Sequence, residues 1–376
     1  MKTVSEINKK IKEGKAVVLT ATEAKLLAEE EGIRALEEKV DVVTTATFSP
    51  MCSSGVFINP GHTSPHMKMQ KVTLDGVEAY GGIATADIYL GATQESREDS
   101  RFGGAHVIKK LIDGESVEFQ AFGKPTDCYP KTEFRKSIKL SDLNQAYFYN
   151  PRNCYQNYDT AYNSSDRELR TYMGILQPNG QTIHYAGSGE ISPLINDPLL
   201  ETIGVGTKIF FCGGEGFVSW EGTQFNLETE RDPKTNLPIG PSATLAITAE
   251  MRGVDPRMIA PIYIPGYGVS IYLSIGMAIP VVSSDIAKAL TIRNKDIITN
   301  IHDYATGKTI GKVNYEALVK NEVYVGEKHA SSRTMSRIKE SYHIMALLKE
   351  KVINGTFILT EPVMKLPIFG KCTPIE

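Results

Sequence analysis

The chain has 376 residues, of which 41% are hydrophobic and 23% charged, a balance typical of a folded globular protein. Its 41 basic and 44 acidic residues give a net charge of −3 and are spread along the chain. This argues against a nucleic-acid-binding surface, which needs clustered positive charge. The N-terminus shows no secretory signal, and the longest apolar stretch, from Val269, contains Pro280 and is shorter than a membrane span. We therefore expect a cytoplasmic protein.

The first predicted elements are a helix and a buried strand. Thr20 and Glu23 have the spacing of a capping box, and they begin a helix that Gly32 can end. The β-branched run at residues 40–48 predicts a buried strand, and Cys52 lies in the loop that follows it. Loops at the ends of strands often display reactive groups, although a structural role is the simpler interpretation of Cys52 taken alone.

Residues 71–149 have mostly the character of β-strands. The Asp75–Gly76 step lies between two β-prone runs and predicts a hairpin, and residues 116–123 alternate in side-chain character. Between them, residues 101–114 read as a glycine turn that leads into a short helix.

The C-terminal half continues this mixture. The hairpin pattern recurs at residues 171–189 around Asn179 and Gly180. Apolar residues at three- and four-residue spacing predict an amphipathic helix over 335–352, and residues 357–367 predict a last strand. The fold class is therefore α+β, a β-dominated middle flanked by helices, with no topology assigned.

The cysteines indicate free thiols. Their number is odd and the chain shows no export signal, so a disulfide framework is not expected. Every interval between them spans dozens of residues, whereas zinc and iron–sulfur sites use closely spaced pairs, so no metal site is predicted. The five are Cys52, Cys128, Cys154, Cys212 and Cys372.

Cys128 lies in the stretch KPTDCYP, where Pro125 and Pro130 disfavour helix in the residues before them. The segment should therefore be a stiff, extended or turned loop that turns the thiol to one side. A reactive cysteine there would need a nearby cation to favour its thiolate, and Lys124 and Lys131 are the local candidates. The alternative is a buried structural cysteine.

The glycine turn offers a different device. Gly103 and Gly104 allow close backbone approach, and a helix that begins at Ala105 would present free N–H groups to an anion such as a carboxylate. Arg101 and His106 would flank that position. The alternative interpretation of these residues is a purely structural tight turn, with Arg101 in solvent and His106 packed against the protein.

Six motifs, in order, resemble one known family. The resemblance runs from about residue 10 to residue 365 and is to the homocysteine biosynthesis (sulfur-incorporation) family, the aspartate semialdehyde sulfurtransferases of anaerobic archaea and bacteria. The motifs are TATFSPMCSSG, RFGGAHVIKKLIDG, GKPTDCYP, NPRNCYQNY, GSGEISPLINDP and TIGVGTKIFFCGGEGFVSWEGTQ.

The resemblance implies an enzyme that joins reduced sulfur to L-aspartate semialdehyde to form homocysteine. Cys128 would carry the sulfur as a persulfide, with Cys52 as the second candidate thiol. It implies one catalytic domain over residues 10–365, of one or two lobes. We expect neither the pair of small regulatory domains into which many relatives continue nor an appended ferredoxin domain. The reaction consumes electrons, so we expect a separate iron–sulfur ferredoxin-like partner and no cofactor bound by this chain. A sulfide donor is the other partner, and a homo-oligomer is compatible with the sequence.

The substrate carries a carboxylate and an ammonium group. We predict that Arg101 and the Gly103–Gly104 turn bind the carboxylate and that His106 donates a proton to the departing oxygen. Two other interpretations stay open: a persulfide carrier that sulfurates another acceptor, and a non-catalytic module that binds a metabolite and regulates a partner.

Overall fold

The computed structural model describes residues 2–367, 373 and 375, so Cys372 lies outside the described residues. A 14-stranded mixed sheet runs through most of the molecule, in the order β1-β2-β19-β15-β16-β17-β9-β3-β6-β5-β4-β7-β8, and β18 pairs with β19. Its strands are β1 (Val18–Thr20), β2 (Val42–Pro50), β3 (Gly55–Asn59), β4 (Met69–Leu74), β5 (Val77–Ile83), β6 (Asp87–Gly91), β7 (Val117–Gly123), β8 (Glu133–Ile138), β9 (Gln145–Asn153), β15 (Lys208–Phe211), β16 (Gly214–Glu221), β17 (Leu245–Glu250), β18 (Ile259–Ile264) and β19 (Gly268–Pro280).

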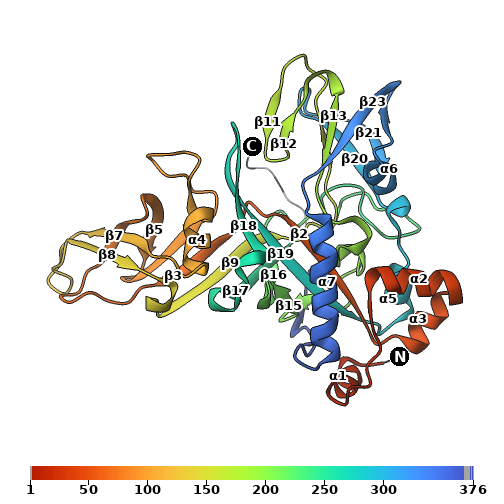
Figure 1. The fold of residues 1–376 in the computed structure, drawn as a ribbon, viewed down its shortest axis with the longest axis horizontal. Helices are drawn as coiled ribbons and strands as arrows, with labels where there is room; N and C mark the ends of the chain where they lie inside the picture. The colour runs from red at the N-terminus through yellow and green to blue at the C-terminus, as the bar shows by residue number, and fades with distance from the viewer. Residues whose placement is uncertain (1, 368–372, 374, 376) are drawn as a thin grey trace.

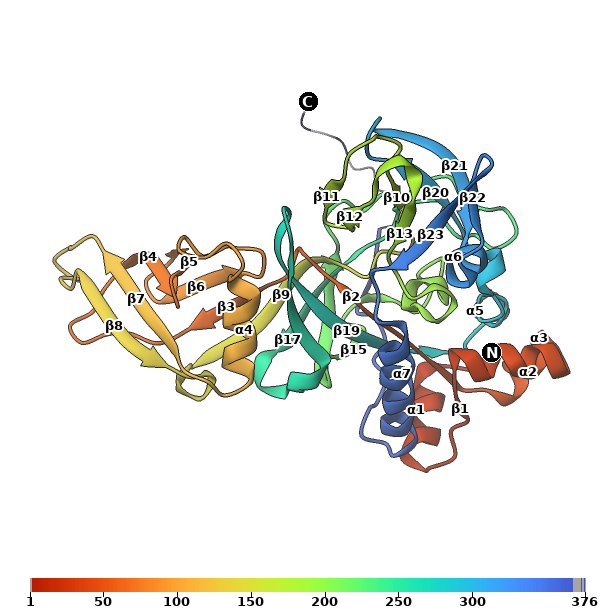
Figure 2. The ribbon, with the colours of Figure 1, turned by 45° about the horizontal axis from the view of Figure 1, so that its top comes forward.

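One end of this sheet projects from the body of the molecule (Figures 1 and 2). Strands β3 to β8, together with helix α4 (Gly104–Ile112), form this projection, which we call the β lobe. The hairpin predicted at Asp75–Gly76 is confirmed, since β4 pairs with β5 and both turn residues have positive φ.

A second sheet of six strands forms an upper lobe in Figure 1, in the order β21-β20-β10-β13-β23-β22. These strands are β10 (Thr160–Tyr162), β13 (Thr182–Tyr185), β20 (Ile298–Asp303), β21 (Lys308–Asn314), β22 (Val323–Val325) and β23 (Lys328–Thr334). Two small pairs complete the strands: β11 (Leu169–Thr171) with β12 (Gly174–Leu176), and β14 (Gly204–Val205) with β24 (Met364–Lys365).

The helices gather mainly around the other end of the large sheet (Figure 2). The capping box at Thr20 and Glu23 is present, and Gly32, at φ 86°, ends the helix as predicted. The amphipathic C-terminal helix is also confirmed and begins at Ile338. The helices are α1 (Val4–Lys12), α2 (Ala21–Glu31), α3 (Ile33–Lys39), α4, α5 (Ser284–Ala289), α6 (Tyr315–Lys320) and α7 (Ile338–Ile353).

Strand β2 is the centre of the core. Eight of its nine residues are buried, as the β-branched run predicted, because β19 and β1 flank it in the sheet and α7 lies across one face. The Thr44 hydroxyl donates to the Met345 carbonyl of α7 at 3.0 Å, which satisfies a polar group inside this layer. The strand therefore leads from the core directly to the loop that contains Cys52.

Two predicted elements are wrong. Asn179 and Gly180 do form a turn, but β12 pairs with β11 while β13 pairs with β10 and β23, so no hairpin spans them. The last predicted strand, 357–367, shrinks to the two residues of β24. β12 pairs instead with its immediate neighbour β11, whereas β13 and β24 pair with β23 and β14, which are more than 140 residues away and which no local pattern indicates.

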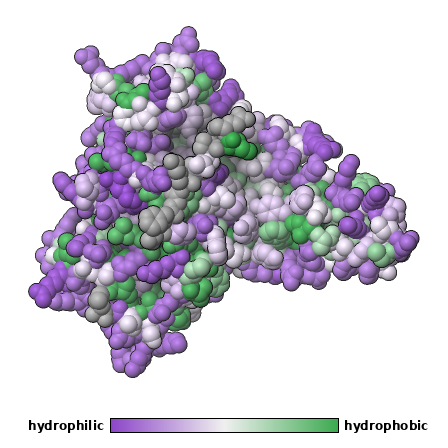
Figure 3. Space-filling view, turned by 180° about the vertical axis from the view of Figure 1, so that it is seen from behind, coloured by the Kyte–Doolittle hydropathy of each residue, from purple (hydrophilic) through white to green (hydrophobic). Residues whose placement is uncertain are grey.

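The surface mixes residue types. Seen from behind, hydrophilic residues surround smaller hydrophobic patches on both the body and the β lobe (Figure 3). Among the described residues, no helix is long and apolar enough to cross a membrane.

Lys25 of α2 is a charged side chain that lies in the protein interior at 1% exposure. Its ammonium donates to Asn196 Oδ1 at 2.9 Å and to the Leu290 carbonyl at 3.0 Å. Burial lowers its pKa from 10.5 to about 7, because the charged form loses hydration, although the charge of Glu190 acts in the opposite direction.

The unfolded chain therefore binds a proton at Lys25 that the folded protein releases between pH 7 and 10.5. We predict that the free energy of unfolding of the wild type rises over this window relative to that of Lys25→Met, by a total on the order of 4 kcal/mol. Urea unfolding at pH 7 and pH 10 measures the difference. Lys9→Met, at an exposed lysine, is the control, and its free energy of unfolding should change with pH as that of the wild type does. The same change between pH 7 and pH 10 in all three proteins would contradict the prediction.

Candidate active site

A cavity of about 370 Å³ lies where the large sheet meets the upper lobe. Much of its wall comes from residues 47–53 at the end of β2, residues 152–158 after β9, residues 186–195, and Tyr267 in the turn between β18 and β19. Tyr172, Met173, Gln224, Tyr315 and Met335 complete the lining. The motifs SPMCSSG, NPRNCYQNY and GSGEISPL all contribute to this wall.

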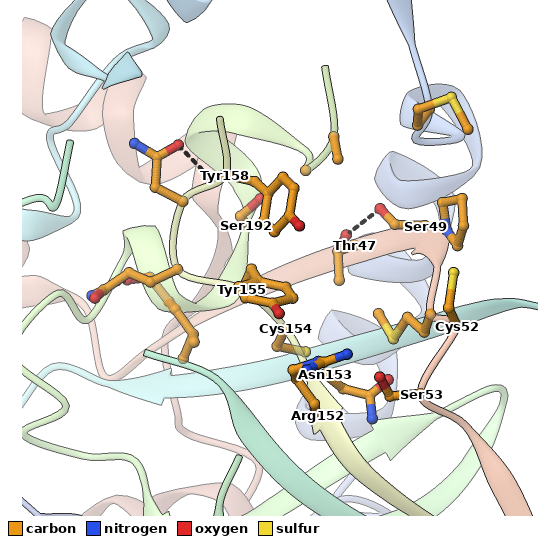
Figure 4. A pocket seen from close by; sticks show the side chains of 18 of the residues that line it. Thr47, Ser49, Cys52, Ser53, Arg152, Asn153, Cys154, Tyr155, Tyr158 and Ser192 are labelled. Atoms are coloured by element: carbon orange, nitrogen blue, oxygen red, sulfur yellow. Dashed lines mark hydrogen bonds between the residues drawn. The ribbon is translucent and has the colours of Figure 1, made fainter. Parts of the chain in front are cut away.

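Figure 4 shows how the labelled side chains surround the cavity. In this view Thr47, Ser49 and Cys52 lie along one side, and tyrosines and a serine from the other segments lie along the opposite side. Arg152 and Asn153 lie at the bottom between the two sides. The cavity therefore combines one half-buried thiol with one cation and several aromatic hydroxyls.

Strand pairing brings Cys52 to Ser270. In the antiparallel register of β2 and β19, Pro50 is opposite Tyr272, and the Met51 amide donates to the Ile271 carbonyl at 2.8 Å. One residue further along, the Ser270 hydroxyl donates to Cys52 Sγ at 3.1 Å. A hydroxyl donor stabilises a thiolate, so the register itself equips this cysteine for nucleophilic chemistry.

Tyr267 supplies a second hydroxyl to the same sulfur. Burial raises the pKa of Tyr267 above its ordinary value, and the neighbouring Cys52, to which the phenol is hydrogen-bonded, raises it further. The phenol therefore keeps its proton at neutral pH and can donate a hydrogen bond to the thiolate or to a substrate oxygen.

Arg152 is the cation of the cavity. Among the described residues its guanidinium has no recorded hydrogen bond or ion pair, although its charge acts on the hydroxyls of Tyr158 and Tyr267. Most arginines that form a side-chain contact in this protein form an ion pair with a carboxylate, as Arg101 does with Asp99. An unpaired guanidinium in a cavity is suited to bind the carboxylate of a ligand.

Aromatic hydroxyls form a chain along the wall. Tyr158 and Tyr172 share a hydrogen bond of 2.9 Å, and Tyr304 donates to Tyr172 at 2.6 Å. Burial raises the pKa of all three phenols, so this chain is neutral at neutral pH. It shapes the cavity without adding charge.

The buried lysine holds another part of the wall. Asn196, which accepts from Lys25, donates through Nδ2 to the carbonyls of Glu190 and Ser192 at 3.0 and 2.8 Å. These carbonyls belong to the segment 186–195 that lines the cavity. The position of this segment therefore depends on helix α2.

Two further cysteines are unreactive by burial. Desolvation raises the pKa of Cys154 and of Cys212 to about 12, so neither forms a thiolate at neutral pH. Cys154 reaches the cavity wall, whereas Cys212 does not line it. All four cysteines in the described part of the chain are free.

Cys128 is exposed and does not line this cavity. It lies in the loop between β7 and β8, at the outer end of the β lobe (Figures 1 and 2). Its sulfur is 3.6 Å from the Thr126 hydroxyl, and Tyr129 stacks on His66 with ring centroids 6.4 Å apart. The structure therefore does not bring Cys128 and Cys52 together.

The glycine turn lies outside the cavity as well. Arg101 is exposed and paired with Asp99 at 3.0 Å. The amides of Gly104 and Ala105 donate to the carbonyls of Gln94 and Ala92, and the Gly103 amide donates to His106 Nδ1. A Cβ at residue 104 would lie 1.9 Å from the Gly91 carbonyl oxygen, so this glycine allows close approach of two backbones.

His106 is half-buried, and desolvation lowers its pKa, so its imidazole is mainly neutral at neutral pH. The roles of this histidine, of Arg101 and of the two glycines in substrate binding stay predictions. In the structure their polar groups already have partners inside the protein.

Four residues at this site were not predicted from the sequence: Arg152, Asn153, Tyr267 and Ser270. A signal for the first two was present, because both lie in NPRNCYQNY, one of the six motifs of the resemblance. Tyr267 and Ser270 carry no local signal, since they reach Cys52 only through the pairing of β2 with β19. Within the described residues, no group of three or more His, Cys, Asp or Glu side chains could hold a metal ion.

A hydroxyl-supported thiol beside an unpaired arginine defines a site for a small electrophile that carries a carboxylate. Residues 16–359 match the family model described as "Homocysteine biosynthesis enzyme, sulfur-incorporation". The chain therefore belongs to this family, and the resemblance seen in the sequence is confirmed.

Curated relatives agree with this assignment. The chain is 42% identical over 383 residues to the L-aspartate semialdehyde sulfurtransferase of Methanocaldococcus jannaschii, which covers 96% of this chain and 73% of the relative. It is 41% identical to the L-aspartate semialdehyde sulfurtransferase of Methanosarcina acetivorans, over 100% of this chain and 74% of the relative. An uncharacterized protein of Methanothermobacter thermautotrophicus is 28% identical over 85% of this chain and 72% of its own length. No solved structure matches.

The hydrogen bond from Ser270 gives a direct test of the thiol environment. We predict that Ser270→Ala slows alkylation of Cys52 at pH 7 by about 5- to 20-fold, because the thiolate loses a hydroxyl donor. Peptide mass spectrometry after timed iodoacetamide treatment measures the rate at each cysteine. Ser274→Ala is the matched control, since this buried serine is on the same strand and its hydroxyl has no partner in the described part of the chain. Equal alkylation rates of Cys52 in the two variants would contradict the prediction that the Ser270 hydroxyl stabilises its thiolate.

Proposed function

We propose that this protein joins reduced sulfur to L-aspartate semialdehyde and forms homocysteine. The observation that carries the proposal is the similarity of 41–42% along nearly the whole chain to two proteins of that name. The cavity supports it, because a small amino-acid aldehyde fits a volume of about 370 Å³ that contains a thiol and a cation.

In the proposed complex, Arg152 binds the carboxylate of the substrate and the aldehyde carbon lies near Cys52. The neutral Tyr267 hydroxyl donates a hydrogen bond to the aldehyde oxygen, which gains negative charge as sulfur attacks. We prefer Arg152 to the Arg101 turn for the carboxylate, because Arg101 is paired and the turn amides are occupied.

The net reaction requires a reductant. One aldehyde, one hydrogen sulfide, two protons and two electrons give one primary thiol and one water. The electrons would come from a separate iron–sulfur ferredoxin-like protein, and this chain would bind no cofactor of its own. We place the reaction in the cytoplasm, where thiols remain reduced.

We propose that Cys128 carries the sulfur as a persulfide, whose outer sulfur comes from a donor of sulfane sulfur such as polysulfide. From this persulfide, one aldehyde, four protons and four electrons give the primary thiol, one water and the free Cys128 thiol. Its exposure at the end of the β lobe makes it accessible to a sulfur donor, whereas the cavity thiol is half-buried. Because Cys128 does not line the cavity, delivery to the substrate needs either a movement of the β lobe or the Cys128 of a second molecule.

The same exposure favours a second candidate function, a carrier that passes sulfur from Cys128 to another acceptor. The two functions differ in the need for the cavity. A carrier would keep its activity toward another acceptor when Cys52 is replaced, whereas the sulfurtransferase would not.

Replacing either thiol tests the proposal. We predict that Cys128→Ser and Cys52→Ser each lower homocysteine formation from polysulfide, a donor of sulfane sulfur, at least about 100-fold, because a hydroxyl is a far weaker sulfur carrier or nucleophile. The assay is anaerobic, contains a chemical reductant, and detects homocysteine by mass spectrometry. All variants carry Cys372→Ser, which leaves the four described cysteines.

Cys212→Ala is the matched control, since this thiol is fully buried and does not line the cavity. It should keep most of the activity once a folded state is verified by circular dichroism. Full activity of Cys128→Ser would exclude the persulfide at this residue. Recovery of activity after mixing Cys52→Ser with Cys128→Ser would show that sulfur passes between molecules, and lack of recovery would favour transfer within one chain.

A further inference from the structure

Asn153, the last residue of β9, is the one side-chain amide on the cavity wall whose oxygen and nitrogen both lack a recorded partner among the described residues. The residue is 1% exposed. An amide buried in this way destabilises the fold unless something else completes its hydrogen bonds.

The neighbouring amides behave differently. Gln156 donates to the carbonyls of Leu194 and Pro198 at 3.1 and 2.8 Å. Asn157 donates to the carbonyls of Pro238 and Ile298, both at 2.8 Å. These side chains join segments of the cavity wall, whereas the side-chain amide of Asn153 forms no hydrogen bond with any residue that the structure describes.

The backbone beside Asn153 is also unusual. Cys154, which follows it, has φ 53°, in the left-handed region that a non-glycine residue adopts at an energetic cost. The pairing of β9 with β17 is irregular between Leu245 and Ile247, close to where the strand ends. The chain thus leaves its strand abruptly after Asn153 and continues along the cavity wall.

The charged groups on the cavity wall indicate which group of a ligand the Asn153 amide can bind. Arg152 is the one charged side chain among the described residues that line it, and no carboxylate is present there. A ligand with a carboxylate has its counter-charge, but an ammonium group on the same ligand has none. A neutral oxygen must then accept its hydrogen bonds, and Asn153 Oδ1 is a buried amide oxygen of the wall with no partner among the described residues.

We propose that Asn153 determines specificity for an α-amino acid, an inference that rests on the proposed function. Asn153 Oδ1 accepts from the α-ammonium of the substrate, and Nδ2 donates to the α-carboxylate that Arg152 also binds. The two groups sit on one carbon of the substrate, so a single amide reaches both. The aldehyde at the other end of the substrate then points to Cys52.

Two substrates that differ only in the amine test this. For L-aspartate semialdehyde, Asn153→Ala should lower kcat/KM by about 10- to 100-fold, mainly through KM, because two hydrogen bonds are lost. For 4-oxobutanoate, the same aldehyde acid without the amine, kcat/KM should change by less than about threefold relative to the wild type. Gln145→Ala, at the exposed other end of β9, is the control and should change neither.

A second readout does not depend on turnover. L-homoserine should protect Cys52 of the wild type from alkylation and should protect Cys52 of Asn153→Ala far less. 4-hydroxybutanoate, which lacks the amine, should protect Cys52 of either protein less than L-homoserine protects that of the wild type. Because the variant removes an unpartnered buried amide, its thermal midpoint without ligand should equal or exceed that of the wild type.

Three results overturn the inference: unchanged selectivity in an active Asn153→Ala variant, equal loss toward both substrates together with a lower thermal midpoint, or no protection of wild-type Cys52 by L-homoserine. A wild type that L-homoserine protects but that does not convert L-aspartate semialdehyde would reject the proposed function and keep amino-acid recognition by Asn153. The two failures are therefore distinguishable.

Discussion

The pairing of β2 with β19 is the constraint on which the site depends. Nine residue pairs join the two strands, and nearly every residue of both is buried. A slip of one residue would turn the apolar side chains of a strand to its other face, so burial specifies the register strongly. The same register, continued beyond Pro50, places Ser270 beside Cys52. The energy that holds the core thus also positions the thiol.

The rest of the cavity consists of irregular segments that the two sheets hold in place. Lys25 and Asn196 fix the segment 186–195, and hydroxyl contacts among Thr47, Ser49 and Ser336 join the end of β2 to the start of the last helix. Such polar contacts add little to net stability when complete, but a buried group without a partner is costly. The Asn153 amide, which has no partner among the described residues, therefore costs stability. Lys25 has hydrogen-bond partners, but burial of its charge is costly too, as its lowered pKa shows. Both lie where the cavity wall is built.

The separation of the two thiols suits the proposed chemistry. A sulfur carrier must meet donors of varied shape, and an exposed loop at the end of a lobe allows this. An aldehyde that is being converted needs a site that water enters poorly, and the half-buried Cys52 has such surroundings. One thiol cannot satisfy both demands, which gives a physical reason for two.

Short-range patterns in the sequence were sufficient for the α+β class, for α2 with its capping box, for β2, for the turn at Asp75–Gly76 and for α7, because caps, turns and periodicity act over a few residues. They failed for the hairpin expected around Asn179–Gly180, because β12 pairs with its neighbour β11 and β13 pairs with β10 and the distant β23. The six motifs sufficed for the family.

The sequence also singled out Cys52 and Cys128, but it could not show that they lie apart. No pattern in the sequence favoured Arg152 over Arg101 as the residue that binds the carboxylate. The structure distinguishes them, because Arg101 pairs with Asp99 whereas Arg152 lines the cavity and has no ion pair among the described residues. Tertiary structure alone decided which donors Cys52 receives and which amide is left without a partner. Those facts depend on contacts between segments more than 100 residues apart, as in the 218-residue separation of Cys52 and Ser270, and the chain order does not record them.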